Sequence, residues 1–407
     1  MATIAFKYQV RDRSGKLISG ESNAETEAAL VRRLKSMGYA PVSIEATNTG
    51  LQKEIKIPGF GGRVKLKDLA IFSRQFATMI NSGLSLMRAL SILAEQTESK
   101  LFAGFISEVR NDVEAGNSLS AAMAKHPKVF PPLMVNLCKA GEIGGFLDTV
   151  LLQIAENYEA EVKLRAKIKS AMTYPIVVGC IAIIALVVML TFVVPSFAKI
   201  FTSLGSKLPA PTQMLVDISH AMKFVLPLGI ILAIAGTIVW RRIRDREDVR
   251  RVVDPLKLKV PVFGLLFQKV AIARFARNLG TMIKSGVPIL QALDIVADTT
   301  GNWTITQAVH DVQESVRQGE SLTQPLSQHD VFPPMVVQMM AVGEDTGALD
   351  TMLAKIAEFY DQEVEATTEA LTALIEPIMI AVLGGLVGSM IVCLYLPIFE
   401  VYNHIGS

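Results

Sequence analysis

Two long apolar runs interrupt an otherwise mixed pattern of hydrophobic and polar positions. Each run is bounded by prolines and holds 19 residues without a charged side chain, at 175–195 and at 377–397. A helix needs about 20 apolar residues to cross roughly 30 Å of hydrocarbon. Buried helices of soluble domains are usually shorter and carry charge on one face. The two runs therefore predict transmembrane helices.

A third apolar run covers 224–240 and contains Pro227. It is shorter than the other two, but the long side chain of Lys223 can reach the polar interface at one end. Trp240 suits the interface at the other end. The run predicts a further transmembrane helix, with a buried helix of a soluble domain as the alternative.

The distribution of lysine and arginine predicts how these helices are oriented. Four basic residues precede the first span, and six arginines lie between Arg241 and Arg251 after the second. The connecting segment 196–223 holds three lysines. Because cytoplasmic flanks keep the positive excess, the N-terminus and the middle domain are predicted in the cytoplasm, with 196–223 and the tail 398–407 outside. The arginine run also predicts a topology anchor that contacts anionic membrane lipid, with a specific protein contact as the alternative.

The soluble parts of the chain form an internal repeat. The segment starting at Ile71 has its counterpart at Arg274, and the sequence VFPP occurs at Val129 and at Val331. AGEIGGFLD from Ala140 matches VGEDTGALD. The prolines that bound the two 19-residue runs keep the same spacing. A repeat of this kind predicts two related domains, each leading into a membrane helix.

Within each repeat the apolar residues recur at helical spacing, as Phe72, Phe76 and Met79 do in the first. Ser99 and Ser118 are predicted N-caps, and Pro131-Pro132 is a predicted helix start. About six helices per repeat result. The last of them is expected to continue into the membrane span with little interruption.

The first 46 residues follow another pattern. Alternating residues flank Ser14-Gly15 as in a β-hairpin, and a helical segment closed by Gly38 precedes a further strand. A small α+β module is predicted there, followed by a glycine- and proline-rich linker.

The predicted fold class is an all-α integral membrane protein with two repeated cytoplasmic helical bundles, three transmembrane helices and this small module. The chain is expected to begin with the α+β module (1–46), a linker (47–64) and the first bundle (65–174). The first span (175–195), an outer loop (196–223) and the second span (224–240) follow. A basic linker (241–267), the second bundle (268–376), the third span (377–397) and an outer tail (398–407) complete the expected order.

Composition agrees with a membrane protein and narrows its chemistry. Hydrophobic residues make up 51% of the 407 residues, and the mean hydropathy is +0.40. A formal net charge of +2 gives no broad basic footprint for nucleic acid, so no nucleic-acid partner is expected. Three widely separated cysteines predict neither a disulfide framework nor a metal site.

No sequence motif of a known catalytic or nucleotide-binding site occurs in the chain. A phosphate-binding loop, a dinucleotide fingerprint, a zinc-binding HExxH pair and a nucleophile elbow are all absent from the sequence. No catalytic residue, cofactor or metal is therefore predicted. His126 and His329 occupy equivalent repeat positions, where a structural role at a helix end is expected.

The repeated GE(x)2G(x)LD pattern is the candidate partner interface. Glycine can end a helix in a left-handed turn, and an acidic residue favours the start of the next helix, so local geometry is one explanation. An acidic turn that contacts a partner or the other repeat is the second. The candidate residues are Gly141, Glu142, Gly145, Asp148, Gly343, Glu344, Gly347 and Asp350.

Taken together, the repeat, the paired VFPP and GE(x)2G(x)LD motifs and the three spans resemble the type II secretion F family. Within that family the chain is most similar to the inner-membrane platforms of type IV pilus assembly. The resemblance covers nearly the whole chain. It implies a platform in the bacterial inner membrane that couples a cytoplasmic ATPase to the insertion or removal of pilin subunits.

The partners implied by the resemblance are an assembly or retraction ATPase, pilin subunits, other inner-membrane assembly proteins and further copies of the chain. A secretion platform that drives a pseudopilus is the alternative within the family. A membrane transporter is a third hypothesis, but the predicted spans lack the paired internal charges typical of a polar-substrate pathway.

Overall fold

The computed structural model describes residues 4–11, 17–24, 27–36, 38–47, 64–203, 209–244, 246–261 and 263–405. The chain divides into two compact units, Met1–Arg63 and Val64–Ser407, each described by itself. The segment 48–63, predicted as a linker, and the turn at Ser14-Gly15 lie outside the described residues.

The described residues of the first unit form three strands and one helix. The strands β1, β2 and β3 form an antiparallel sheet in the order β2-β1-β3, and α1 lies between β2 and β3 in sequence. Val10, Leu30 and Leu34 form its small core. Gly38 has a φ of +86° just after α1, a conformation that glycine adopts without strain. The elements are Ile4–Arg11, Leu17–Ala24, Glu27–Ser36 and Ala40–Thr47.

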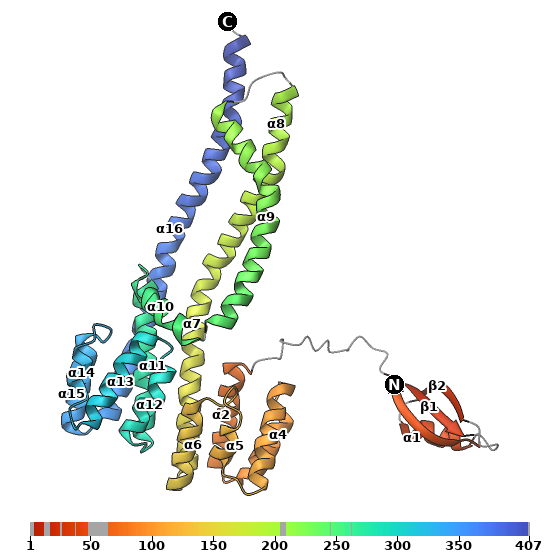
Figure 1. The fold of residues 1–407 in the computed structure, drawn as a ribbon, viewed down its shortest axis with the longest axis vertical. Helices are drawn as coiled ribbons and strands as arrows, with labels where there is room; N and C mark the ends of the chain where they lie inside the picture. The colour runs from red at the N-terminus through yellow and green to blue at the C-terminus, as the bar shows by residue number, and fades with distance from the viewer. Residues whose placement is uncertain are drawn as a thin grey trace. The chain divides into compact units, whose positions relative to one another are not determined.

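The second unit begins with the first helical bundle (Figure 1). Six helices form this repeat, as predicted. The hydroxyl of Ser99 accepts a hydrogen bond from the N–H of Phe102, and Ser118 accepts one from Ala121, so both predicted N-caps are confirmed. The helices α2 to α7 are Leu66–Asn81, Leu86–Gln96, Lys100–Glu114, Leu119–Ala124, Pro132–Gly144 and Leu147–Val188.

The second bundle repeats this order. Asn302 caps its third helix through the N–H groups of Thr304 and Ile305, at 2.9 and 3.4 Å. A proline begins the fifth helix in both bundles, because proline at the first helical position costs no hydrogen bond. The helices α11 to α16 are Phe263–Lys284, Ile289–Thr299, Trp303–Arg317, Thr323–Ser327, Pro334–Thr346 and Leu349–Ile405.

Buried aromatic rings mark the centre of each bundle. In the first bundle Phe72 lies 5.3 Å from Phe102 and 6.1 Å from Phe130 between ring centroids. In the second bundle the equivalent rings of Phe275 and Phe332 are 5.2 Å apart. The apolar residues of both bundles belong to one continuous cluster. Burial of this apolar surface is the main force that holds the two bundles together.

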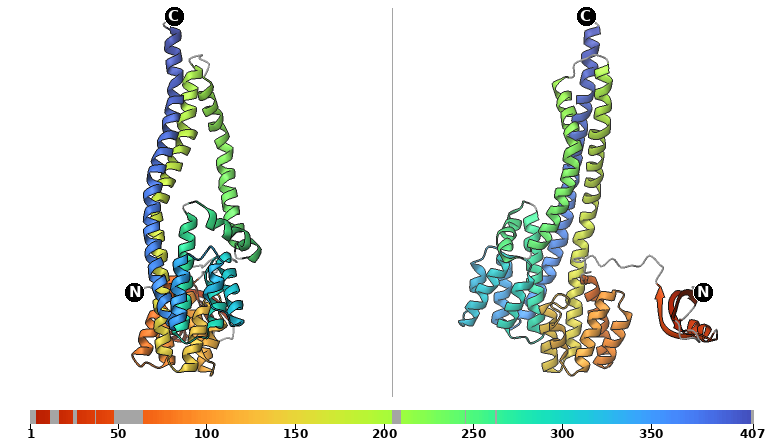
Figure 2. Two further views of the ribbon diagram at one scale, coloured as in Figure 1. Left: turned by 90° about the vertical axis from the view of Figure 1, so that its left-hand side faces the viewer. Right: turned by 45° about the vertical axis from the view of Figure 1, so that its right-hand side comes forward.

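The two long helices α7 and α16 lie side by side (Figure 2). Helix α7 passes through Pro175 and continues into a π-helical turn, Met189–Val193, and then into α8, Val194–Ser203. The third long helix is α9, Ala210–Ile243. All three helical stretches are long and apolar enough to cross a membrane.

The described residues differ from the predicted connections in three places. Most of the predicted loop 196–223 is helical, because α8 continues to Ser203 and α9 already starts at Ala210. The predicted basic linker 241–267 contains a further helix, α10, Glu247–Lys259. The predicted tail 398–407 is helical as far as Ile405. Apolar or amphipathic spacing extends each of these helices beyond the charge-free runs that guided the prediction.

Candidate functional site at the seam between the bundles

The paired glutamates of the repeated motif cap short helices inside their own bundles. The carboxylate of Glu142 accepts hydrogen bonds from the backbone N–H groups of Leu119 and Ser120, at 2.5 and 3.1 Å. Glu344 accepts one from the N–H of Leu322 at 2.9 Å. The first N–H groups of a helix have no partner within the helix, and a carboxylate there also complements the helix dipole. Both glutamates therefore have a structural role.

The glycines of the motif are required by backbone geometry. Gly145 and Gly347 end their helices with φ of +73° and +71°, in the left-handed region that disfavours other residues. A Cβ on Gly141 would lie 3.1 Å from the Cα of Leu147, and one on Gly343 would lie 2.9 Å from the Cα of Leu349. The fifth and sixth helices of each bundle thus approach closely at these glycines.

The two aspartates of the motif lie in the first turns of α7 and α16. Asp148 is exposed, whereas Asp350 is half-buried and lines a cavity between α7, α11 and α16. Among the described residues, no hydrogen bond or ion pair joins the four motif residues of one bundle to the four of the other. Of the four acidic candidates, Asp148 is the one whose side chain is exposed, and its contact with a partner stays a prediction.

The substitutions Glu142→Ala and Asp148→Ala should separate the two explanations of the motif. Removing the Glu142 carboxylate leaves the N–H groups of Leu119 and Ser120 without their acceptor, so we expect a loss of about 1–3 kcal/mol in the free energy of unfolding. Asp148→Ala should change stability little. Thermal unfolding of the purified variants measures both effects. Equal stability of Glu142→Ala and the parent protein would contradict the capping role.

Equivalent ion pairs connect the first helix of each bundle to the last helix of the same bundle. Arg74 of α2 binds Glu159 of α7 at 2.6 Å, and Arg277 of α11 binds Asp361 of α16 at 2.5 Å. The hydrogen bond from Arg74 to Glu159 raises the pKa of the Arg74 guanidinium above its ordinary value. Both arginines belong to the segments that first identified the repeat. The two copies therefore share a role despite their different neighbouring residues.

A buried polar seam joins the two bundles. The side-chain amide of Asn157 on α7 donates to the amide oxygen of Asn278 on α11 at 3.0 Å, and both residues are buried. Asn278 in turn donates to the hydroxyl of Thr299 at 2.8 Å. One turn away, the hydroxyl of Ser285 donates to Gln153. Buried hydrogen bonds depend on direction, so they fix the register of the two bundles more sharply than apolar contacts do.

Charged side chains extend the seam along α7 toward the apolar parts of α7 and α16. Glu161 on α7 binds Arg274 on α11 at 2.6 Å and also lies 3.9 Å from Arg277. Further along, Lys167 of α7 binds Glu365 of α16. Beside the seam lies an open cleft of about 310 Å³ lined mainly by polar residues of α7, α11 and α16. Movement of one bundle against the other would act directly on α7 and α16.

Beyond the seam, the pair α7 and α16 becomes apolar. A groove of about 370 Å³ lies between them and is lined by apolar residues together with Tyr174 and Glu376, which occupy equivalent repeat positions. A second apolar groove of about 270 Å³ lies further along the same two helices. Pro175 and Pro377 occupy equivalent repeat positions, and each removes one backbone hydrogen bond from its helix.

The two histidines at equivalent repeat positions have acidic partners that could not be predicted from the sequence. His126 lies 3.3 Å from Glu108, and His329 lies 3.2 Å from Asp311 at the equivalent repeat positions. Both follow a short helix, as expected. No group of three or more histidine, cysteine, aspartate or glutamate side chains among the described residues could hold a metal ion.

The seam was not predicted from the sequence. Gln153, Asn157 and Glu161 recur every four residues on α7 and therefore share one face of the helix. That spacing was the available signal. This four-residue spacing did not stand out, because neighbouring charged residues made the whole segment resemble a solvated helix.

Comparison with known proteins identifies similar chains along the whole length. The family model for type II secretion system protein F matches residues 72–195 and 275–397, once for each repeat. The model for the N-terminal domain of that protein matches residues 1–45. These matches cover most of the chain and reproduce the internal repeat.

Individual relatives are similar over nearly their full lengths. The chain is 46% identical to the type IV pilus assembly protein PilC of Myxococcus xanthus, over 98% of this chain and 95% of the relative. It is 45% identical to PilC of Thermus thermophilus, over 97% and 98% of the two chains. It is 32% identical to the type II secretion system protein F of Vibrio cholerae, over 98% of both.

Proposed function

Because the chain belongs to the type II secretion system protein F family, we propose that it is the inner-membrane platform of a type IV pilus assembly machine. The observation that carries this proposal is the identity of 45–46% with two pilus assembly proteins over almost the whole chain. Identity with a type II secretion protein of the same family is 32%. Secretion through a pseudopilus is the second candidate because both groups share the family and the repeat.

The proposed arrangement keeps both bundles in the cytoplasm. Three apolar helices and the family indicate an inner-membrane protein. In the proposal the N-terminal module and the bundles lie on the cytoplasmic side, and the connection between α8 and α9 lies outside. The six arginines after the second span support this orientation, since positive residues are retained in the cytoplasm. The spans at 175–195, 224–240 and 377–397 separate these regions.

In this proposal the protein transmits force and does not catalyse a reaction. A cytoplasmic ATPase moves the bundles, and α7 and α16 carry the movement into the membrane. The continuity of these two helices and the seam that joins them support this mechanism. Pilin subunits would be inserted or removed beside the spans. Homo-oligomerisation and contacts with other inner-membrane assembly proteins complete the proposed set of partners.

Deletion of the gene in its native host tests the proposed function. We expect pilin to disappear from the sheared surface fraction, while secretion of folded exoproteins continues. Immunoblots of sheared cells and of culture supernatants measure the two outcomes, and a plasmid copy of the gene should restore the pili. A deletion strain that keeps normal pili, or that loses secretion and keeps pili, would refute the assignment to pilus assembly.

A further inference from the structure

Helix α10 carries apolar side chains on the face directed away from the protein. Val252 and Leu256 are 69% and 63% exposed. They lie two residues on either side of the buried Asp254, which is about 200° around a helix, so they point away from the face that Asp254 occupies. A helix on the surface of a soluble domain normally has polar residues on its outer face. On this side of α10 the exposed Val252 and Leu256 lie together with the exposed Asp248 and Lys259, so the outer face is amphipathic and not uniformly polar.

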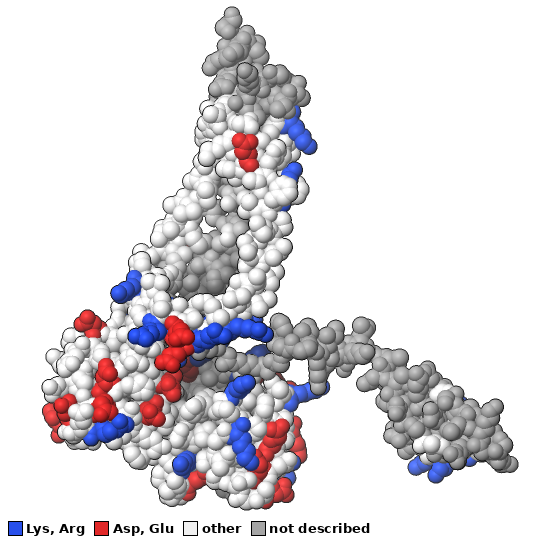
Figure 3. Space-filling model, viewed as in Figure 1, with Lys and Arg blue, Asp and Glu red and all other residues white. Residues whose placement is uncertain are grey.

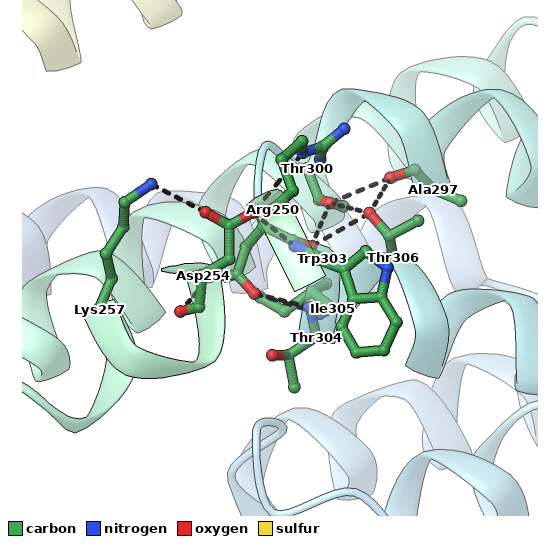
Figure 4. Close-up of polar contacts among 10 residues, drawn as sticks. Arg250, Asp254, Lys257, Ala297, Thr300, Trp303, Thr304, Ile305 and Thr306 are labelled. Carbon is green, nitrogen blue, oxygen red and sulfur yellow. Dashed lines mark hydrogen bonds and ion pairs between the residues drawn. The ribbon is translucent and has the colours of Figure 1, made fainter. Parts of the chain in front are cut away.

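The inner face of α10 is fixed to the second bundle (Figure 4). The carboxylate of Asp254 accepts a hydrogen bond from the N–H of Trp303, at the start of α13, at 3.1 Å. It also binds Lys257 at 2.8 Å, and Arg250 lies 3.6 Å away. The guanidinium of Arg251 lies 5.7 Å from the centre of the Trp303 ring. These contacts hold α10 in place, so the outward direction of its apolar face is a property of the fold.

The position of α10 in the chain brings it to the membrane surface. Helix α9 ends at Ile243 and α10 begins at Glu247. Four residue steps can span at most about 14 Å. The apolar run of α9 ends at Trp240, a residue type that favours the membrane interface. If α9 crosses the membrane as proposed above, the first residue of α10 lies within that distance of the end of α9 and therefore close to the membrane interface.

The charge around α10 suits an anionic surface. Six arginines lie between Arg241 and Arg251, and Lys257 and Lys259 follow in the last turn of α10, against two acidic residues in its first turn. Three of these basic residues, Arg250, Arg251 and Lys257, also contact Asp254 or Trp303, which leaves the arginines before α10 and Lys259 as the main basic groups for lipid. Figure 3 shows lysine and arginine side chains, with acidic side chains beside them, where the long, almost uncharged helices meet the bundles. Helices that lie in the membrane interface combine an apolar face with flanking basic residues in this way. Each basic residue near an anionic surface contributes about 1 kcal/mol to binding.

We propose that α10 is an interfacial helix whose Val252 and Leu256 side chains insert into an anionic lipid surface and hold the second bundle against the membrane. Its inner face binds the N-terminal end of α13 and its outer face binds lipid. The inference rests on the proposed crossing of α9. It assigns to the second bundle a direct membrane contact, which gives that bundle a fixed point when the first bundle moves.

Labelling of the full-length protein at one reactive cysteine tests this contact. Cys180 and Cys393 are replaced by alanine. Cys138 is kept, because it is buried and burial raises the pKa of its thiol, which leaves it unreactive. An environment-sensitive NBD fluorophore is attached at Val252→Cys, with Leu256→Cys as a second position. The matched control is Val342→Cys, an equally apolar and 53% exposed position on α15 of the same bundle.

The labelled proteins are reconstituted into nanodiscs of equal parts phosphatidylcholine and phosphatidylglycerol, with and without brominated acyl chains. We expect a blue shift and a loss of emission in brominated lipid at Val252→Cys and Leu256→Cys, and neither at Val342→Cys. Nanodiscs of phosphatidylcholine alone should weaken the quenching. Quenching at Val252→Cys no greater than at Val342→Cys would overturn the proposal, as would quenching that does not depend on anionic lipid.

Two further outcomes separate this inference from the proposed function. A label at Ile234→Cys in α9 reports on the crossing itself, and its failure to be quenched would remove the premise about α9. A label at Val252→Cys that is shielded from aqueous iodide and is not quenched by brominated lipid would mean that protein covers the face, which also overturns the proposal. Pilus production plays no part in either measurement.

Discussion

Insertion of Gly-Ser-Gly-Ser between Ala171 and Met172 should abolish pilus assembly while the protein still reaches the membrane. The insertion lies in α7, between the seam and the apolar groove. Glycine in a helix interior costs about 1 kcal/mol relative to alanine, so the inserted segment favours a flexible break. If it stayed helical, it would turn the span by about 40° and move it by about 6 Å relative to the bundle. Either result disconnects α7 from the seam.

The same insertion between Ala373 and Leu374 of α16 should have the same effect, because these residues occupy the equivalent repeat positions. An insertion within 48–63, predicted from the sequence as a linker, is the matched control and should be tolerated. Membrane fractionation measures the amount of protein, and sheared-surface pilin measures assembly. Normal pili with an insertion in both α7 and α16 would show that these helices do not transmit the movement.

The substitution Phe102→Ala should strongly destabilise the first bundle. The Phe102 side chain is fully buried and packs against Phe72 and Phe130. Removing a buried phenylalanine leaves a cavity and typically costs about 3–5 kcal/mol. Domains of this kind are stable by only about 5–15 kcal/mol, so the loss is a large part of the total. We expect a lower unfolding temperature, faster proteolysis of the bundle and loss of pili.

The neighbouring residue provides the control for this substitution. Leu101 is 42% exposed on the same helix, so Leu101→Ala should change the free energy of unfolding by no more than about 0.5 kcal/mol. Thermal unfolding of both purified variants in the same detergent makes the comparison direct. If Phe102→Ala unfolded at the temperature of the parent protein, the aromatic cluster could not be the centre of the bundle core.

The seam explains how two bundles with a continuous apolar core can still have one preferred register. Apolar packing is not directional, whereas the hydrogen bonds of Asn157 and Asn278 require a particular alignment of α7 and α11. Each such bond contributes only about 0.5–1.5 kcal/mol net. A shift of one bundle along the other therefore breaks contacts that are individually weak. Such a seam suits a protein that is proposed to pass movement between its domains.

Several elements could be predicted from local patterns because their physical cause is local. Ser99 and Ser118 cap their helices, and Pro132 begins α6, because capping and proline geometry depend on a few adjacent residues. The apolar spans followed from length and the absence of charge. The six-helix repeat followed from helical spacing and from the second copy, which supplied an independent instance of every element.

Other features depend on residues that are distant in sequence. The sequence motif allowed both a geometric role and a partner contact for Glu142 and Glu344, and their carboxylates accept hydrogen bonds from N–H groups at the start of another helix. Residues 247–259, which form α10, were predicted as part of the basic linker 241–267, because charged residues and Pro255 obscure their amphipathic spacing. Its outward apolar face has meaning only once Asp254 is seen bound to α13.

By itself, the sequence determined the number of apolar spans, the duplication and the family, since composition and periodicity are properties of the chain. The tertiary structure decided which polar residues face each other across α7, α11 and α16, which motif residues are used internally, and which apolar face of α10 is left outside. Those outcomes depend on how helices far apart in sequence pack together, and helical periodicity gives the face of a residue without giving its neighbour.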